Sequence, residues 1–161
     1  MKRIEELDKK YEVLFWSIAL PGFGQLLNRK YVKGIILIAI EFLINVKGFI
    51  NVVIISSFLG KMNQAIDDAD FQWIMFYPCV YLFAIWDAYR DAGGGSSPFM
   101  YLPFVFSAYF GTIGVIYSAS FKIYGKLIGP VFLPIIMIFF GCVVGFILRK
   151  IIILTLRTKE K

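Results

Sequence analysis

Four polar side chains interrupt the apolar run 34–60 in a pattern that suits proton or ion chemistry: Glu41, Asn45, Lys47 and Asn51. On an α-helix they share one arc of about 160°. An ionisable group inside a bilayer is costly unless it is paired or hydrated, which makes it a functional candidate. We predict a candidate intramembrane polar site in which Glu41 takes up a proton or a cation. In the structural alternative, Glu41 meets a polar group on another helix and Lys47 extends to the interface. Lys47-Gly48 is also a point where the run can bend.

A charge cluster lies at the end of the apolar segment 71–90, on the side that is predicted to be cytoplasmic. Asp87, Arg90 and Asp91 are three or four residues apart, so they share one edge of a helix. The neighbouring Trp86 and Tyr89 are typical of a membrane interface. The cluster therefore predicts an anchored helix end. The alternative is that Asp87 reaches across to the basic loop 29–33 and locks the fold.

Groups for other kinds of chemistry are scarce. The chain has no histidine, which removes the commonest general base and the imidazole metal ligands. Cys79 and Cys142 fall inside apolar segments and act as small hydrophobes. The glycine-rich stretch 93–98 lacks the lysine of a phosphate loop and is interpreted as a flexible linker. We expect no catalytic residues, no metal and no cofactor.

A proline–glycine turn near the start of the chain predicts a structural site. Pro21 stops a helix because it lacks an N–H group, and Gly22 and Gly24 permit tight backbone angles. Gln25 and Asn28 are expected to hydrogen-bond the exposed backbone of this turn. We interpret both as structural clamps, with ligand contact as the alternative.

Two stripes of small residues predict close helix packing, because small side chains let backbones approach each other in lipid. The stripes are Ser107, Gly111, Gly114 and Ser118 in one segment, and Gly141 and Gly145 in another. We expect these two helices to pack on each other or on a second copy of the chain.

The elements that position these residues are predicted to be membrane helices. Of the 161 residues, 59% are hydrophobic and only 17% are charged, against about 45–50% and 25% in soluble domains. Apolar windows of about 20 residues can cross a bilayer as helices. We predict one all-α integral membrane domain over 1–161, a polytopic helix bundle with four spans. A helix over 2–19 enters from a charged end and is re-entrant or half-spanning. The parts are 1–33 for the N-terminal helix and PGFGQ turn, 34–60, 71–90, 99–120 and 130–150 for the spans, and 151–161 for a basic cytoplasmic tail.

The distribution of lysine and arginine predicts the orientation, since these residues gather on the cytoplasmic side. If 13–28 re-enters, the inner side holds 13 cations and the outer side three. If 13–28 spans, the best division is nine against seven. The re-entrant arrangement is therefore favoured, with both termini cytoplasmic. The inner set is Lys2, Arg3, Lys9, Lys10, Arg29, Lys30, Lys33, Arg90, Arg149, Lys150, Arg157, Lys159 and Lys161, and the outer set is Lys61, Lys122 and Lys126.

The turn carries a family resemblance. Residues 21–26, followed by Asn28, Tyr31 and Lys33-Gly34, resemble the P-G-x-G-Q-x-Y-N…K-G element of small bacterial multipass proteins akin to the two-transmembrane domain family. Trp86-Asp87 resembles the end of that family's second helix. The family's charged-Arg-Phe triplet is missing, Leu27 stands where tyrosine is usual, and the stretch between Gly34 and Trp86 is longer than in the family. The resemblance implies a multi-pass protein of the bacterial inner membrane with no assigned chemistry.

The sequence is compatible with three functions. The leading one is a non-enzymatic accessory, assembly or envelope-related component whose partners are the lipid bilayer and a second copy or another membrane protein. The second is a small-solute or ion transporter that uses the polar site at 41–51. A lipid-modifying enzyme ranks last because catalytic groups are scarce. Nucleic acid is not an expected partner, because the cations flank apolar segments and form no surface patch.

Overall fold

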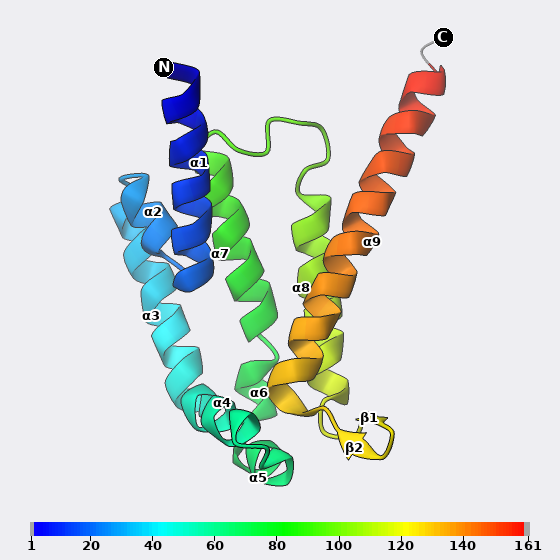
Figure 1. Ribbon diagram of the computed structural model, residues 1–161. Helices are drawn as coiled ribbons and strands as arrows, with labels where there is room; N and C mark the ends of the chain where they lie inside the picture. The colour runs from blue at the N-terminus through cyan, green and yellow to red at the C-terminus, as the bar shows by residue number, and fades with distance from the viewer. Residues whose placement is uncertain (1, 160–161) are drawn as a thin grey trace.

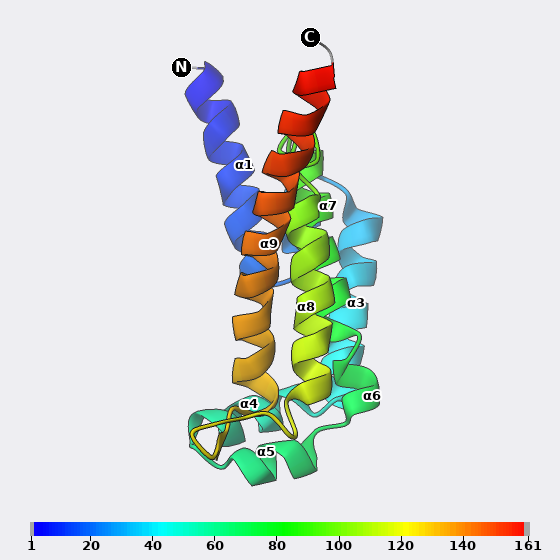
Figure 2. The ribbon, with the colours of Figure 1, turned by 90° about the vertical axis from the view of Figure 1, so that its right-hand side faces the viewer.

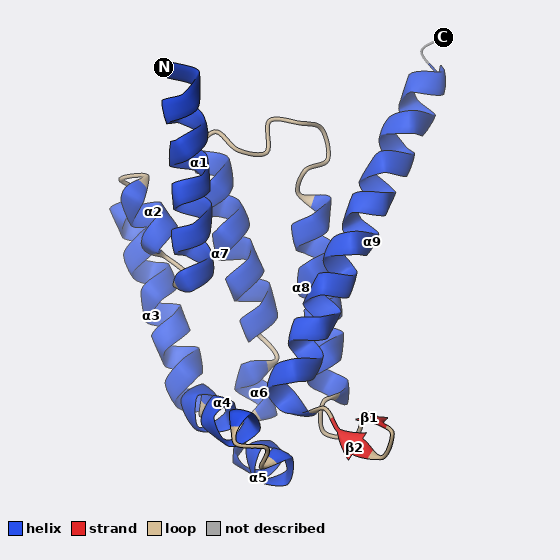
Figure 3. Cartoon of the chain, in the orientation of Figure 1, coloured by secondary structure: helices blue, strands red, loops and turns tan. Residues whose placement is uncertain are grey.

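The computed structural model describes residues 2–159, with side chains from residue 4 onward, and its architecture is all-helical apart from one short hairpin (Figure 3). The elements, in chain order, are α1 (Lys2–Ala19), α2 (Phe23–Leu27), α3 (Tyr31–Lys47), α4 (Ile50–Phe58), α5 (Met62–Asp68), α6 (Phe71–Ile74), α7 (Tyr77–Asp91), α8 (Leu102–Tyr117), β1 (Lys122–Ile123), β2 (Lys126–Leu127) and α9 (Gly129–Lys159). The two strands are antiparallel.

The long helices run lengthwise through the bundle, and α3 and α9 lean away from each other toward the end where the termini lie (Figures 1 and 2). Helix α7 packs against α1, α3 and α8, and α8 packs along α9. The start of α1 and the end of α9 lie at the same end of the bundle, while α5 and the hairpin lie at the opposite end (Figure 1). We call these the terminal end and the hairpin end.

Helices α1 and α2 form a hairpin that goes part of the way along the bundle and returns (Figure 1). Pro21 and Gly22 make the reversal, and Gly22 has a left-handed φ of 99°. A side-chain carbon at Gly22 would collide with Ile38 and with the carbonyl oxygen of Gly34. Glycine is therefore required here by backbone angle and by the close approach of α3.

The run 34–60 bends at Lys47-Gly48, the point that the sequence marked as able to bend, and the structure divides it into α3 and α4 with an angle of 62° between them. Gly48 caps α3, and Phe49 takes a left-handed φ of 54°. The helix over 71–90 is also divided, into α6 and α7. Pro78 lies in the first turn of α7 and has no N–H group, so it cannot donate the backbone hydrogen bond that would continue the helix from α6.

Two other boundaries differ from expectation. The segment 99–120 is helical only over Leu102–Tyr117, since Phe99 has a left-handed φ of 58° before the helix begins. The described part of the expected tail, residues 151–159, is not a separate element. It continues α9, because its apolar residues and good helix formers extend the pattern of 130–150 without a break.

Helix α9 is long and apolar enough to cross a membrane, and the bent pair α3–α4 is a second such element if it is counted as one span. The 31 residues of α9 extend about 46 Å, more than the roughly 30 Å of hydrocarbon in a bilayer. Helix α8 is equally apolar in character but shorter, with 16 residues.

Candidate functional site

A buried carboxylate joins three helices near the terminal end. Asp87 of α7 is 4% exposed. The fully buried amide of Gln25, from α2, donates to the Asp87 Oδ2 atom at 3.2 Å and to the carbonyl oxygen of Ala84 at 2.9 Å. Lys33, in the first turn of α3, donates through Nζ to the Asp87 Oδ1 atom at 2.9 Å. Asp87 is thus the common acceptor for α2 and α3, and we call this cluster the α2–α3–α7 lock.

Further contacts widen the lock along α7. Asn28 Nδ2 donates to the carbonyl oxygen of Ala88 at 2.8 Å. Lys33 Nζ also lies 3.3 Å from Asp91 Oδ2, and Arg90 Nη2 lies 3.5 Å from Asp87 Oδ1. All three members of the predicted charge cluster, Asp87, Arg90 and Asp91, therefore take part, and the cation that crosses from the basic loop region is Lys33.

The hydrogen bond to Asp87 raises the pKa of Lys33 above its ordinary value of 10.5, more than burial lowers it. A raised pKa means that folding stabilises the charged lysine, and this stabilisation is lost only as the pH rises through the raised pKa. Lys33 therefore carries its positive charge at neutral pH.

Gln25 and Asn28 do not bond the turn, contrary to the sequence prediction. Helix α2 satisfies the backbone itself, for example through Leu26 N to Gly22 O and Asn28 N to Gly24 O. The two side chains are then free to reach α7. Gly24 permits this approach, since a side-chain carbon there would collide with Ser17 and Ala88.

The polar residues at 41–51 are not gathered into one site. Glu41 is 9% exposed and faces α7, where Tyr77 and Tyr81 are its neighbours. Asn45 instead bonds Asn51 at 3.2 Å on an exposed surface, and Lys47 is also exposed. The bend after Lys47 turns α4 away from the line of α3, so a helical arc drawn through Asn51 does not describe one face.

The two stripes of small residues bring α8 and α9 together. The backbone of Gly141 lies against the carbonyl group of Phe106, and that of Gly145 lies against Pro103. In return, Gly111 lies against Ile138 and Gly114 against the backbone of Pro134.

The serines of these stripes have different roles. Ser107 Oγ donates across the interface to the carbonyl oxygen of Ile138 at 3.0 Å. Ser118 is buried but bonds within its own helix, to the carbonyl oxygen of Val115 at 2.7 Å. Ser107 therefore ties α8 to α9, and Ser118 caps the end of α8.

An apolar groove of about 570 Å³ lies between the α1–α7 pair and the α8–α9 pair. Its walls include Leu14 from α1, Ile85 from α7, Phe104 from α8 and Cys142 from α9. A second cavity of about 310 Å³ shares Ile18, Tyr81, Ile135 and Ile138 with it and extends the groove toward α4. No sequence signal marks the groove, because its lining consists of ordinary apolar side chains of helices far apart in the chain.

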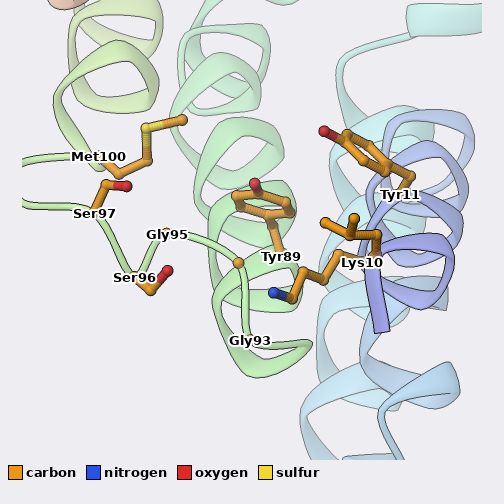
Figure 4. Close-up of a pocket in the computed structure, with 10 residues that line it drawn as sticks. Lys10, Tyr11, Tyr89, Gly93, Gly95, Ser96, Ser97 and Met100 are labelled. Atoms are coloured by element: carbon orange, nitrogen blue, oxygen red, sulfur yellow. The ribbon is translucent and has the colours of Figure 1, made fainter. Parts of the chain in front are cut away.

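A small polar cavity of about 110 Å³ lies at the terminal end of the groove. Lys10 and Tyr11 of α1 line one side, and Tyr89 with the loop 93–97 lines the other (Figure 4). Tyr11, Tyr89 and Met100 line both this cavity and the groove, so the two are adjoining. We call the cavity the polar mouth.

The loop at 93–98 is packed, which corrects its interpretation as a simple linker. Gly94 is buried against the ring of Tyr89, and Gly95 lies against Trp86. Gly93 and Gly95 have φ values of 80° and 68°. A larger residue at Gly94 would displace the Tyr89 ring, so the glycines let the loop cover the end of α7.

The described residues offer no metal site, since no three His, Cys, Asp or Glu side chains gather as ligands. What the molecule offers to a ligand is an apolar groove with a polar mouth, beside a lock whose charges are paired with each other. The chain was compared with protein-family models, with curated proteins and with solved structures, and none of them matches it.

Proposed function

We propose that this chain is a non-enzymatic multi-pass protein of the bacterial inner membrane that acts by binding within the bilayer. The crossings are made by α3 with α4, by α7, by α8 and by α9, and the α1–α2 hairpin re-enters without crossing. The observation that carries the proposal is the large apolar side chains exposed around the bundle: Phe42, Phe139 and Ile35 are 71%, 69% and 62% exposed. An apolar surface of this extent is costly in water and matches a lipid environment.

The charges at the two ends of the bundle support a defined orientation. The terminal end carries the cations of α1, of the α2–α3 region, of the end of α7 and of the second half of α9. The hairpin end carries Lys61, Lys122 and Lys126 together with three aspartates, Asp67, Asp68 and Asp70. Because cations gather on the inner side, we propose that the terminal end is cytoplasmic. Lys161, which the sequence prediction counted on that side, lies outside the described residues.

The hydrogen bonds among the polar groups of the lock favour a binding role over catalysis. The carboxylate, amide and ammonium groups of the α2–α3–α7 lock bond to each other, so the lock holds helices together. The apolar groove of about 570 Å³ is lined by none of the lock's residues. We therefore assign the lock a structural role and the groove the binding role of an accessory protein.

Cysteine labelling tests the orientation. In a chain with Cys79 and Cys142 replaced by serine, Tyr124→Cys at the tip of the hairpin should react with a membrane-impermeant maleimide on intact spheroplasts. Tyr124 is fully exposed there. Glu5→Cys in α1 and Ser96→Cys in the loop 93–97 should react only after the membrane is permeabilised.

The same variants separate the alternatives. If α1 crosses the membrane completely, Glu5→Cys will react on intact spheroplasts while Ser96→Cys will not. Reaction of Ser96→Cys and protection of Tyr124→Cys would reverse the orientation. Extraction of the chain from membranes by alkaline carbonate would contradict the multi-pass proposal as a whole.

A carrier of protons or small cations is the second candidate, and Glu41 favours it. The Oε2 atom of its carboxyl group is buried and has no hydrogen-bond partner among the described residues. A carrier should show proton- or cation-driven flux in proteoliposomes that Glu41→Gln abolishes and that Asn51→Ala, at an exposed site, leaves unchanged. Equal flux through Glu41→Gln and the unchanged protein, both folded, would remove this candidate.

A further inference from the structure

The groove and the polar mouth form one amphipathic site with an apolar body and a cationic end. The body lies between helix pairs that are each internally fixed. Tyr81 of α7 donates through its hydroxyl to the carbonyl oxygen of Ile18 in α1 at 2.6 Å, and α8 and α9 are in backbone contact at their glycines. The space is therefore built into the packing of two rigid pairs.

We propose that this site binds one anionic membrane lipid, with an acyl chain in the groove and the headgroup phosphate in the polar mouth. The assignment rests on the proposed function, since it requires the terminal end to lie at the inner surface of a membrane. It names the class of ligand for the groove: an amphiphile that carries a negative charge next to its apolar part.

The polar mouth offers hydrogen-bond donors and a positive charge. The Lys10 side chain extends toward the loop 93–97, with its ammonium group near Gly93 and Tyr89 (Figure 4). Within the described residues, Lys10 makes no ion pair. Several donors of the loop 93–97 also donate no hydrogen bond within the described residues. They are the backbone N–H groups of Gly95, Ser96 and Ser97 and the hydroxyls of the two serines. Charge and donors together match a phosphate group.

The size of the cavities favours a headgroup and one acyl chain over a partner helix. A helix with side chains is about 10 Å across, so each turn fills roughly 400 Å³. The groove of about 570 Å³ thus accommodates little more than one turn of a helix. Sites for small molecules run from about 300 to 1,000 Å³. The polar mouth, at about 110 Å³, has room for a compact anion such as a phosphate.

The position of the mouth matches a lipid at the inner leaflet. It lies at the terminal end, where the cations gather, and Tyr11, Tyr89 and Met100 connect it directly to the apolar groove. Tyrosine prefers this boundary between hydrocarbon and water. A soluble anion would use only the mouth, whereas a lipid uses the mouth and the groove together.

Lipid titration of the purified full chain in detergent tests the proposal, with bound lipids counted by native mass spectrometry. Phosphatidylglycerol should bind with one molecule per chain, more tightly than phosphatidylcholine. Lys10→Gln should weaken phosphatidylglycerol binding about fivefold, since one cation near an anionic lipid contributes about 1 kcal/mol. Lys10→Arg should retain binding, and Lys9→Gln, at an exposed lysine outside the mouth, should behave as the unchanged chain.

A second pair of variants tests the groove without touching the mouth. Cys142→Trp fills the groove and should prevent binding of both lipids. Val143→Trp adds the same side chain at an exposed neighbour that does not line the groove and should bind as before. A monodisperse profile on size exclusion confirms that both variants are folded.

Several outcomes overturn the proposal. The first is that Lys10→Gln binds phosphatidylglycerol as tightly as Lys9→Gln does. The second is that Cys142→Trp binds lipid as tightly as Val143→Trp does. The third is that inorganic phosphate binds at the mouth as tightly as phosphatidylglycerol. Loss of self-association instead of lipid in Cys142→Trp would assign the groove to a second copy of the chain. The cysteine labelling is independent: if it gives the expected orientation and no lipid is bound, the lipid proposal fails and the proposed function stands.

Discussion

Replacing Asp87 with asparagine is expected to destabilise the fold by about 2–3 kcal/mol. The substitution keeps the shape of the side chain but removes the negative charge that accepts from Lys33 and Gln25. Breaking a fully buried ion pair costs about 3–5 kcal/mol. We expect a smaller loss because the Lys33 side chain is 49% exposed and recovers part of its hydration.

Thermal unfolding of the purified chain in detergent measures this effect, and the midpoint should fall by roughly 5–10 °C. Asp91→Asn is the matched control, because its side chain is more exposed, at 18%, and accepts only one longer contact from Lys33. It should cost less than about 1 kcal/mol. Equal losses for the two variants would show that Asp87 is not the centre of the lock.

Replacing Gly141 with leucine is expected to have the second large effect, by separating α8 from α9. The first carbon of any side chain at this position meets the carbonyl group of Phe106 and the backbone of Ser107. Backbone atoms cannot turn aside as a flexible side chain can, so the helices must move apart. Overpacking in cores costs about 1–3 kcal/mol, and we expect at least the upper end of this range. The groove wall formed by α8 and α9 would shift as well.

Thermal unfolding and folded yield measure the outcome, with Val143→Leu as the control two positions away. Val143 is 57% exposed, so a larger apolar side chain there meets no protein atom that must move. A Gly141→Leu variant that is as stable as Val143→Leu would contradict the observed α8–α9 contact. Gly145→Leu should repeat the effect, since Pro103 lies against that glycine.

Local patterns in the chain were sufficient to predict the helical class and several elements. The expected helix over 2–19 coincides with α1, because apolar spacing and a following proline and glycine define both its body and its end. The stripes of small residues also predicted a close helix pair. The spacing of glycines along a helix is visible in the sequence, and in a membrane such glycines mainly let two helices approach closely.

Breaks inside apolar runs were harder to predict, because composition does not distinguish one long helix from two short ones. In the run 34–60, Lys47-Gly48 marked a point where the chain can bend, but the sequence did not show that Phe49 adopts a left-handed φ and that α4 leaves the axis of α3. Pro78 was a visible signal for the break before α7, since proline removes one backbone donor. The helical arc at 41–51 failed because it assumed a straight axis through this bend.

The residues themselves determined that this chain is apolar and helical, that its cations gather around apolar segments, and that its first turn reverses at Pro21-Gly22. The sequence offered a contact between Asp87 and the basic loop 29–33 as an alternative, and the fold selected Lys33 for it, 54 positions away. Only the fold brought Gln25 to Asp87, 62 positions away, and enclosed a groove between α1 and α9. The physical reason is that backbone preferences act over a few neighbouring residues and repeat along the chain. Which buried donor meets which acceptor, and where space is left between helices, depends on how all the helices pack at once.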